Sequence, residues 1–232
     1  MRKLFLFISF SVLSFSVFSQ EEDDITLTYK ESRVAATKPG SWFADKGKIY
    51  QIDKSGNTVE YKVGGTRFEL NSIQFVTKER GFAVGDSGTI VKTTDGGMSW
   101  EPVMCPLADA NLNHVYFVNI NVGYIVGTYG AILKTIDKGE SWTVQNSSTT
   151  KDLFMTHFVN TDIGFVVGEN GRILKTVNGG GKWKRISAIG FDDITDMSFI
   201  DEKNGYVVST KGVMYHTVNG GRNWYKVERE LY

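Results

Sequence analysis

Four copies of one eight-residue phrase constrain what this chain can fold into. Each copy ends in a tryptophan, and the four tryptophans follow one another at intervals of 42, 41 and 41 residues. The copies read TTDGGMSW, TIDKGESW, TVNGGGKW and TVNGGRNW, beginning at Thr93, Thr135, Thr176 and Thr217. Self-similarity with a period of about 40 residues indicates a repeat architecture, and it has to be settled before any catalytic motif is sought.

Each repeat carries signals for four short strands. The first strands are expected at residues 73–76, 115–118, 156–159 and 197–200. The runs that follow, FAVG, YIVG, FVVG and YVVS, are apolar without alternation, which predicts a second strand covered on both faces. A glycine turn then leads to a third strand, and the eight-residue phrase turns the chain into a fourth.

A fainter fifth copy lies upstream of the other four. Gly40, Gly47 and Ile49 each stand 41 residues before their counterparts in the next repeat. In this alignment Trp42 matches Ala83 of the second strand, so it is not one of the repeated tryptophans. Five units of four strands account for nearly all of the chain from residue 32 onward.

Repeats of this kind predict an all-β fold, a β-propeller of about five four-stranded blades. Four antiparallel strands cannot bury two apolar faces by themselves, but neighbouring units stacked around an axis can bury them for each other. A linear β-solenoid is the alternative, although its coils usually have far shorter periods. We expect residues 32–232 to form this single domain.

Residues 1–19 have the pattern of a secretory signal peptide. Arg2 and Lys3 precede an apolar stretch from Leu4 to Phe18, and small residues follow at the cleavage spacing. The stretch is shorter than the roughly 18 to 20 residues that span a bilayer. We therefore expect an exported protein, periplasmic or extracellular, with no integral membrane segment after cleavage. Residues 20–31 are expected to be a flexible N-terminal segment.

Charge and cysteine content narrow the classes of partner. Without Arg2 and Lys3, 24 basic side chains face 26 acidic ones. This near-neutral balance gives no electrostatic reason to expect nucleic acid or an anionic membrane. Cys105 is the only cysteine, so no intramolecular disulfide forms, and we expect an inert, buried thiol.

The repeated phrase has a structural interpretation. Its Asp or Asn can accept hydrogen bonds from backbone N–H groups shortly downstream, its glycine suits backbone angles closed to other residues, and its tryptophan can act as an apolar wedge between blades. Because two copies carry Asn, neither proton transfer nor metal binding fits the set. The residues assigned this structural role are Thr93, Asp95, Gly97, Trp100, Thr135, Asp137, Gly139, Trp142, Thr176, Asn178, Gly180, Trp183, Thr217, Asn219, Gly221 and Trp224.

The phrase T-x-[DN]-x-G-x-x-W resembles the Asp-box, also called the BNR repeat. Together with the upstream pattern F-V-x(4)-G-[FY]-x-V-G-x-x-G-x-[IL]-x-K-T, the repeats resemble those of the photosystem II stability and assembly factor family. The resemblance covers four units, from about residue 73 to 227, and weakens in the first. It implies an Asp-box propeller whose relatives act as non-catalytic assembly or binding scaffolds.

Asp-box propellers also include sialidases and related glycoside hydrolases, so an enzyme was weighed. A glycosidase needs paired carboxylates, or a tyrosine nucleophile with its base, on loops at one face. A sialidase also needs several arginines that converge on the carboxylate of its substrate. The arginines here share no repeat position, and the loops between units are short. No catalytic residue is assigned.

No metal or other cofactor is predicted. The three histidines, His114, His157 and His216, occupy three different repeat positions, and the single cysteine offers no thiolate pair.

One position varies within an otherwise fixed frame. The second residue of the expected first strand is polar in every unit and has apolar neighbours. If the first strands lie nearest the axis, these side chains could line a mouth or channel that binds a partner. This candidate binding ring comprises Arg33, Gln74, Tyr116, His157 and Ser198.

The sequence therefore predicts an exported, non-catalytic β-propeller that binds another protein, as a scaffold or assembly factor at the cell envelope. Two alternatives stay open: a lectin-like propeller that binds carbohydrate, and a sialidase-like glycoside hydrolase. A lectin should repeat aromatic and amide groups at equivalent loop positions, which the loops between units do not.

Overall fold

The computed structural model describes residues 7–9, 14–20, 24–30, 42–45, 48–61, 63, 69–190 and 192–227. This part of the chain is built from β-strands, with one short 3-10 turn, η1 (Thr128–Gly130), between two of them. The all-β prediction is confirmed.

Five antiparallel sheets follow one another along the chain, and we call them blades 1 to 5. Blade 1 consists of β4 (Trp42–Asp45), β5 (Lys48–Ile52) and β6 (Thr58–Tyr61). Blade 2 consists of β7 (Leu70–Phe75), β8 (Gly81–Gly85), β9 (Ile90–Thr93) and β10 (Glu101–Pro102). Blade 3 consists of β11 (Leu112–Phe117), β12 (Gly123–Gly127), β13 (Ile132–Thr135) and β14 (Thr143–Val144). Blade 4 consists of β15 (Leu153–Phe158), β16 (Gly164–Gly168), β17 (Arg172–Thr176) and β18 (Lys184–Ala188). Blade 5 consists of β19 (Ile194–Phe199), β20 (Gly205–Ser209), β21 (Met214–Thr217) and β22 (Tyr225–Lys226).

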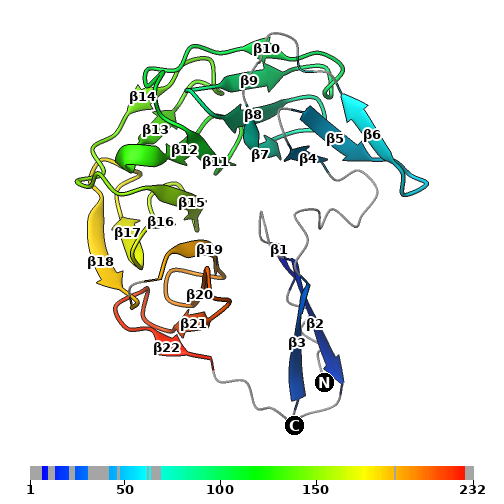
Figure 1. Cartoon of the computed structure of the whole chain (residues 1–232). Helices are drawn as coiled ribbons and strands as arrows, with labels where there is room; N and C mark the ends of the chain where they lie inside the picture. Colours follow the sequence, from blue (N-terminus) through cyan, green and yellow to red (C-terminus); the bar gives the residue numbers. More distant parts are fainter. Residues whose placement is uncertain are drawn as a thin grey trace.

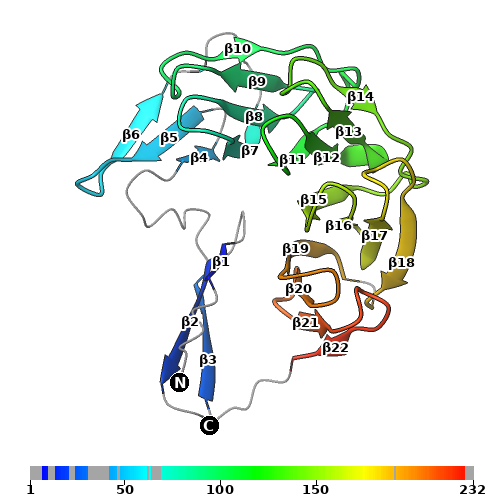
Figure 2. The same ribbon diagram turned by 180° about the vertical axis from the view of Figure 1, so that it is seen from behind.

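The blades stand side by side on an arc, as in a β-propeller (Figure 1). The first strands β7, β11, β15 and β19 lie innermost, and each contacts the next along the arc. The five-bladed propeller predicted from the repeats is thus confirmed. Blades 1 and 5 stand at the two ends of the arc, and the strands β1, β2 and β3 are drawn between these two ends in both views (Figures 1 and 2). The expected inner strand of blade 1 falls on residues outside the described part.

A separate three-stranded sheet precedes blade 1. Its strands are β1 (Phe7–Ser9), β2 (Ser14–Gln20) and β3 (Asp24–Lys30), in the order β1-β2-β3. The described residues of the predicted signal peptide, 1–19, and of the predicted flexible segment, 20–31, lie in this sheet. Cleavage and export stay predictions.

The apolar core lies between blades. Four clusters of buried side chains occupy the four junctions, and each draws residues from two neighbouring sheets. The second strands β8, β12 and β16 are buried along their whole length, as their non-alternating apolar runs predict. No blade covers its own two faces, and each therefore depends on its neighbours.

Three aromatic rings meet at each junction. Between blades 2 and 3, Phe82 stacks on Phe117 with ring centroids 4.5 Å apart, and Trp142 presents its edge to both. Such stacked and edge-to-face pairs contribute about 0.5–1.5 kcal/mol each beyond the burial of their area. The corresponding sets at the other junctions are Trp42, Phe75 and Trp100; Tyr124, Phe158 and Trp183; and Phe165, Phe199 and Trp224.

The position of Trp42 corrects the sequence alignment of the first repeat. Trp42 pairs with Gln51 across β4 and β5, as Phe82 pairs with Lys92 across β8 and β9. Trp42 therefore occupies the place of Phe82, one residue from the expected match with Ala83. The apolar spacing alone could not reveal this shift, because the turn between β4 and β5 is shorter than its counterpart.

Three of the four Asp-box glycines, Gly97, Gly139 and Gly180, leave room for an aromatic ring of the preceding blade, whereas Gly221 faces the side chain of Ile186. Gly139 has φ of +79°, and a Cβ atom there would overlap the ring of Phe82. Gly56 has a similar φ of +85°, but no atom lies near its absent Cβ. Substituting alanine at the two positions therefore distinguishes backbone strain, which both share, from overpacking, which only residue 139 has.

We expect Gly139→Ala to lower the free energy of unfolding more than Gly56→Ala does. The left-handed backbone costs both variants about 1–2 kcal/mol, and overpacking adds about 1–3 kcal/mol at residue 139 alone. Urea unfolding of both variants measures the difference. If both variants lose the same free energy of unfolding, the ring of Phe82 does not pack closely against Gly139.

Candidate functional site

Members of the candidate binding ring connect one blade to the next. Gln74 Oε1 accepts the N–H of Phe117 at 2.6 Å, and the hydroxyl of Tyr116 donates to the carbonyl of Phe158 at 3.1 Å. Burial lowers the pKa of His157, while a hydrogen bond with the backbone of Phe199 opposes that shift. Each side chain thus reaches the same point of the following innermost strand.

Two of these side chains are also brought together. The rings of Tyr116 and His157 lie 5.4 Å apart. Ser198, on blade 5, makes no such hydrogen bond within the described part of the chain, and Arg33 lies outside the described residues. A role of this ring in binding a partner stays a proposal, because Gln74, Tyr116 and His157 already make structural bonds.

A second position on the innermost strands also links neighbouring blades, and sequence reasoning missed it. A β-bulge precedes this position in blades 2 to 5. Ser72 Oγ accepts the N–H of Val115 at 3.3 Å, and His114 Nδ1 accepts that of Thr156 at 3.5 Å. Met155 Sδ accepts the N–H of Met197 in the same way, at 3.3 Å. Because a hydroxyl, an imidazole and a thioether all serve as the acceptor at this position, no repeated residue type indicates the link in the sequence.

Burial perturbs the titratable residues at this position. Burial, with a smaller contribution from His157, lowers the pKa of His114 to about 4. Asp196 is the equivalent residue of blade 5, and burial raises its pKa well above 3.8. The N–H of Met197 donates a hydrogen bond to Asp196 Oδ1, and this bond opposes part of that shift. Its Oδ2 has no partner, and the residue is 1% exposed.

We expect His114→Met to weaken the acid sensitivity of the fold. The pKa of His114 is depressed in the folded state, so its contribution is full above pH 6.5 and is lost as the pH falls towards about 4. The loss amounts to about 1–3 kcal/mol. Met155 shows that methionine serves this position. Urea unfolding of wild type and His114→Met at pH 7.5, 5.5 and 4.5 measures the free energy of unfolding of each. If that free energy falls equally with pH in both proteins, His114 is not a source of the acid sensitivity.

Each Asp-box turn is organised around its threonine. In blade 3 the hydroxyl of Thr135 donates to Asp137 at 2.7 Å and accepts the N–H of Gly139 at 3.0 Å. Asp137 Oδ1 also accepts the N–H of Ser141, four residues downstream, at 3.0 Å. Hydrogen bonds from Ser141 first, and from Thr135 after it, hold the pKa of Asp137 at about 2. Asn178 makes the same bonds to Thr176 and Lys182 through its amide oxygen.

The indole N–H of the box tryptophan has a hydrogen-bond acceptor in one of the four boxes. The indole N–H of Trp100 donates to the carbonyl of Gly97 at 3.2 Å, whereas those of Trp142, Trp183 and Trp224 have no partner. Stacking fixes each indole edge-on to the rings beside it, and that orientation does not require the hydrogen bond.

We expect Asp137→Asn to change the melting temperature by less than about 2 °C, with no effect of a metal chelator. Thr135→Val, a substitution of similar volume, leaves the N–H groups of Asp137 and Gly139 without their acceptor. It should cost about 1–3 kcal/mol. Thermal unfolding measures the loss of stability in both variants. A large loss in Asp137→Asn with little loss in Thr135→Val would show that the aspartate, and not the threonine, organises the turn.

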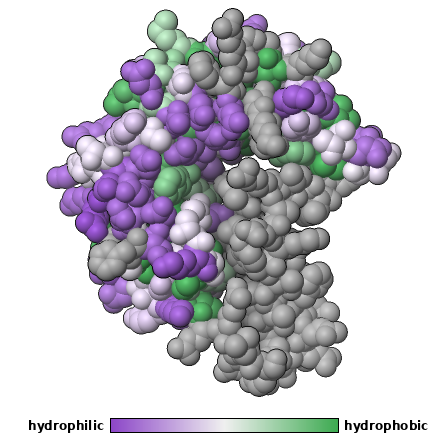
Figure 3. All heavy atoms as spheres, in the orientation of Figure 1, coloured by the Kyte–Doolittle hydropathy of each residue, from purple (hydrophilic) through white to green (hydrophobic). Residues whose placement is uncertain are grey.

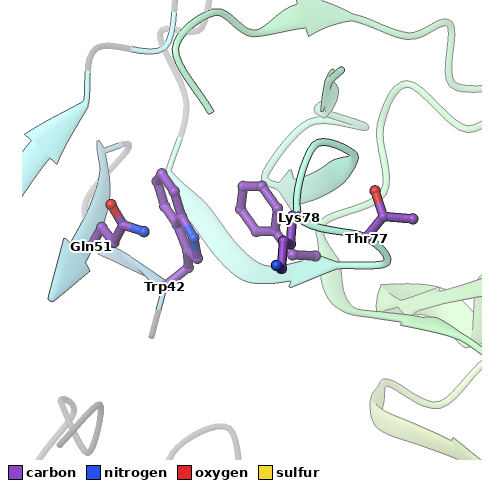
Figure 4. Close-up of a pocket in the computed structure, with 5 residues that line it drawn as sticks. Trp42, Gln51, Thr77 and Lys78 are labelled. Atoms are coloured by element: carbon purple, nitrogen blue, oxygen red, sulfur yellow. The ribbon is translucent and has the colours of Figure 1, made fainter. Parts of the chain in front are cut away.

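An open pocket of about 410 Å³ lies at the junction of blades 1 and 2 (Figure 4). Trp42 and Phe75 stack at 4.6 Å and supply its apolar wall. Gln51, Thr77 and Lys78 surround that wall with an amide, a hydroxyl and an ammonium group. Trp42 stands here in the place that Phe82, Tyr124 and Phe165 take at the other junctions. Elsewhere hydrophilic residues cover most of the described surface in view, over blades 3 and 4 especially (Figure 3).

Neither a metal-binding cluster nor a membrane-spanning helix occurs in the described part of the chain. No group of three or more His, Cys, Asp or Glu side chains there could hold a metal ion. None of its helical segments has the length and apolar character needed to cross a bilayer. Cys105 is half-buried, and burial raises the pKa of its thiol.

A family model described as photosynthesis system II assembly factor YCF48 matches residues 51–150 and 102–190. Together these segments cover more than half of the 232 residues. This chain belongs to that family. The resemblance inferred from the Asp-boxes is therefore confirmed, and the family's description is that of an assembly factor. No match is found among curated proteins.

Solved structures share the fold. A structure of YCF48 bound to a D1 peptide aligns with a TM-score of 0.60 and 22% identity over 72% of this chain and 55% of that one. YCF48 from Cyanidioschyzon merolae aligns with 0.59 and 21%, over 72% and 58%. This chain thus spans little more than half the length of these family members. A GH74 enzyme from Niastella koreensis aligns with 0.63 and 16%, over 78% and 34%, which shows only that an enzyme can share this fold.

Proposed function

We propose that this protein is an exported, non-catalytic scaffold of the cell envelope that binds an extended segment of another protein at the pocket between blades 1 and 2. Membership of an assembly-factor family supports the scaffold, and a family member has been seen bound to a peptide. The N-terminal signal pattern supports export.

The observation that carries the choice of site is the exposed Trp42–Phe75 stack. At every other junction the second-strand aromatic is fully buried, whereas Trp42 is partly exposed and borders an open pocket. A concave apolar wall with a few polar groups is the usual form of a recognition site. It suits one apolar side chain of an extended peptide, and Lys78 favours an acidic residue beside it.

Catalysis is not part of this proposal. Asp95 and Asp137 are held in turns by their own box, and both have pKa values of about 2, which suits a fixed acceptor and not a general acid. Asp196, whose pKa is raised, is buried at a blade face and makes one backbone hydrogen bond.

We expect tagged protein, expressed in its native host, to capture a protein partner from the envelope fraction. Lys78→Glu should reduce the recovered partner about tenfold, the loss of one charge-assisted contact. Lys203→Glu makes the same charge change at an exposed site on blade 5, far along the arc, and should leave capture intact. Quantitative mass spectrometry of the captured material measures both.

Equal capture by Lys78→Glu and wild type would remove the pocket from the proposal. Absence of any envelope partner would remove the scaffold itself. Specific turnover of a fluorogenic sialoside or other glycoside by the same preparation would contradict its non-catalytic part.

A further inference from the structure

The outer strand of blade 4 is longer than the outer strands of blades 2, 3 and 5. β18 has five residues, whereas β10, β14 and β22 have two residues each. β18 is the last strand of its sheet, and β17 is its partner among the described strands. It runs along the outer rim of the arc in both views (Figures 1 and 2). Blade 4 therefore ends in an edge strand of ordinary length, with backbone groups that another strand can use.

Positive side chains gather on this edge. Lys184 and Arg185 are exposed on β18, and Lys182 is exposed two residues before the strand begins. The segment 182–188 contains no acidic residue. The ion pairs of the described residues include none of these three cations. The edge thus carries three like charges that no described carboxylate neutralises.

Arg172 lies beside Arg185 on the same face of the sheet. Arg185 pairs with Leu174 across β17 and β18, and Arg172 is two residues from Leu174, so all three side chains project from one face. Leu174 packs in the core between blades 3 and 4. Burial first, and the charge of Arg185 after it, lower the pKa of Arg172. The two guanidinium groups are therefore close together on the side of blade 4 that faces blade 3.

Arg172 also has a buried donor without an acceptor. Its Nε atom is shielded from solvent and has no hydrogen-bond partner among the described residues. Glu169 lies near enough to oppose the shift in the pKa of Arg172, but its carboxylate is bound by Lys151 at 2.8 Å. A buried N–H group costs free energy unless it is accepted, and a carboxylate is the strongest acceptor for a guanidinium. Arg172 and Arg185 together thus suit one carboxylate from outside the blade.

The repeat does not require arginine at either position. The blades that lack these arginines form the same four-stranded sheets. The arginines therefore serve something other than the propeller, and arginine is among the residues most enriched at the centres of protein interfaces. The equivalents of Arg172 are Thr89, Ala131 and Val213, and those of Arg185 are Pro102, Val144 and Lys226.

Charge decides which kind of strand fits this edge. A second copy of β18 would bring three positive charges against the three already there. Lysines and bulges are the usual protection of an edge against such self-pairing, and β18 has both, since its register with β17 shifts by one residue between Ile173 and Leu174. The same charges attract an acidic strand. The edge thus disfavours its own kind and favours an acidic partner.

We propose that β18 pairs with an extended acidic segment of a partner protein, which adds a fifth strand to blade 4 and places a carboxylate against Arg172 and Arg185. Backbone hydrogen bonds along the edge supply affinity, as in other complexes where a peptide adds a strand to a sheet. Bidentate contacts with the arginines select an acidic side chain. This edge stands on a different part of the arc from the pocket between blades 1 and 2, so it is a second contact surface (Figure 1).

A labelled peptide of alternating glutamate and valine tests the site by fluorescence anisotropy. Wild type should bind it with a Kd of about 0.1 mM at low salt, and a peptide with lysine in place of glutamate should not bind. Arg185→Glu should weaken binding about tenfold or more. Arg172→Met removes the guanidinium but keeps an unbranched apolar stem, and it should weaken binding to a similar extent.

Two charge reversals elsewhere are the matched controls. Arg222→Glu changes an exposed arginine on blade 5, and Lys78→Glu changes the pocket between blades 1 and 2. Both should bind the peptide like wild type. An equal loss in Arg222→Glu would show attraction to net charge alone, and a loss in Lys78→Glu alone would assign the peptide to the pocket. Either result, or no binding by wild type at about 1 mM, would overturn the proposal.

Hydrogen exchange distinguishes an added strand from attraction between charges. In the complex, the amides of Lys184–Ala188 that point away from β17 should exchange more slowly, whereas those of β22 (Tyr225–Lys226) should keep their rates. Mass spectrometry of proteolytic fragments measures both segments. Peptide binding that leaves the exchange of residues 184–188 unchanged would show that no strand is added to blade 4.

Discussion

The structure depends on one contact repeated four times, in which an aromatic ring of one blade stacks on a phenylalanine of the next while a tryptophan edge closes the side. At the junction of blades 3 and 4, Tyr124 and Phe158 lie 3.9 Å apart at an angle of 14°, and Trp183 meets Phe158 at 87°. Because a four-stranded sheet has two apolar faces, it gains stability only through such neighbours. The arc is the geometric result of repeating that contact.

Hydrogen bonds make the contact directional. The innermost strands are linked by side chains that reach the backbone of the following blade, as Gln74 and Ser72 do from blade 2. Lysines at the third strand add a polar bond at the outside, where Lys134 donates to the carbonyl of Gly179 at 2.6 Å and lies over the ring of Tyr124. Each blade thus fixes the tilt of the next.

Recognition is expected where this regular pattern fails. The junction between blades 1 and 2 uses Trp42 where the other junctions use phenylalanine or tyrosine, and an open pocket lies beside it. On blade 5 the carboxyl oxygen Oδ2 of Asp196 is buried without a hydrogen-bond partner. The pocket lies where the repeat is degenerate, whereas the second-strand aromatic rings of the other junctions are fully buried.

The sequence alone determined the propeller, the four strong blades and the turn chemistry of the Asp-box, since period, apolar runs and glycines act locally or between adjacent repeats. Thr135 and Asp137 could be assigned to a turn because their partners lie within four residues. The tertiary structure alone decided the register of Trp42, the use of Gln74 and Tyr116 as links between blades, and the burial of Asp196. These depend on which backbone atom of the following blade lies opposite a side chain, about 40 residues away in sequence, and no local pattern encodes that distance.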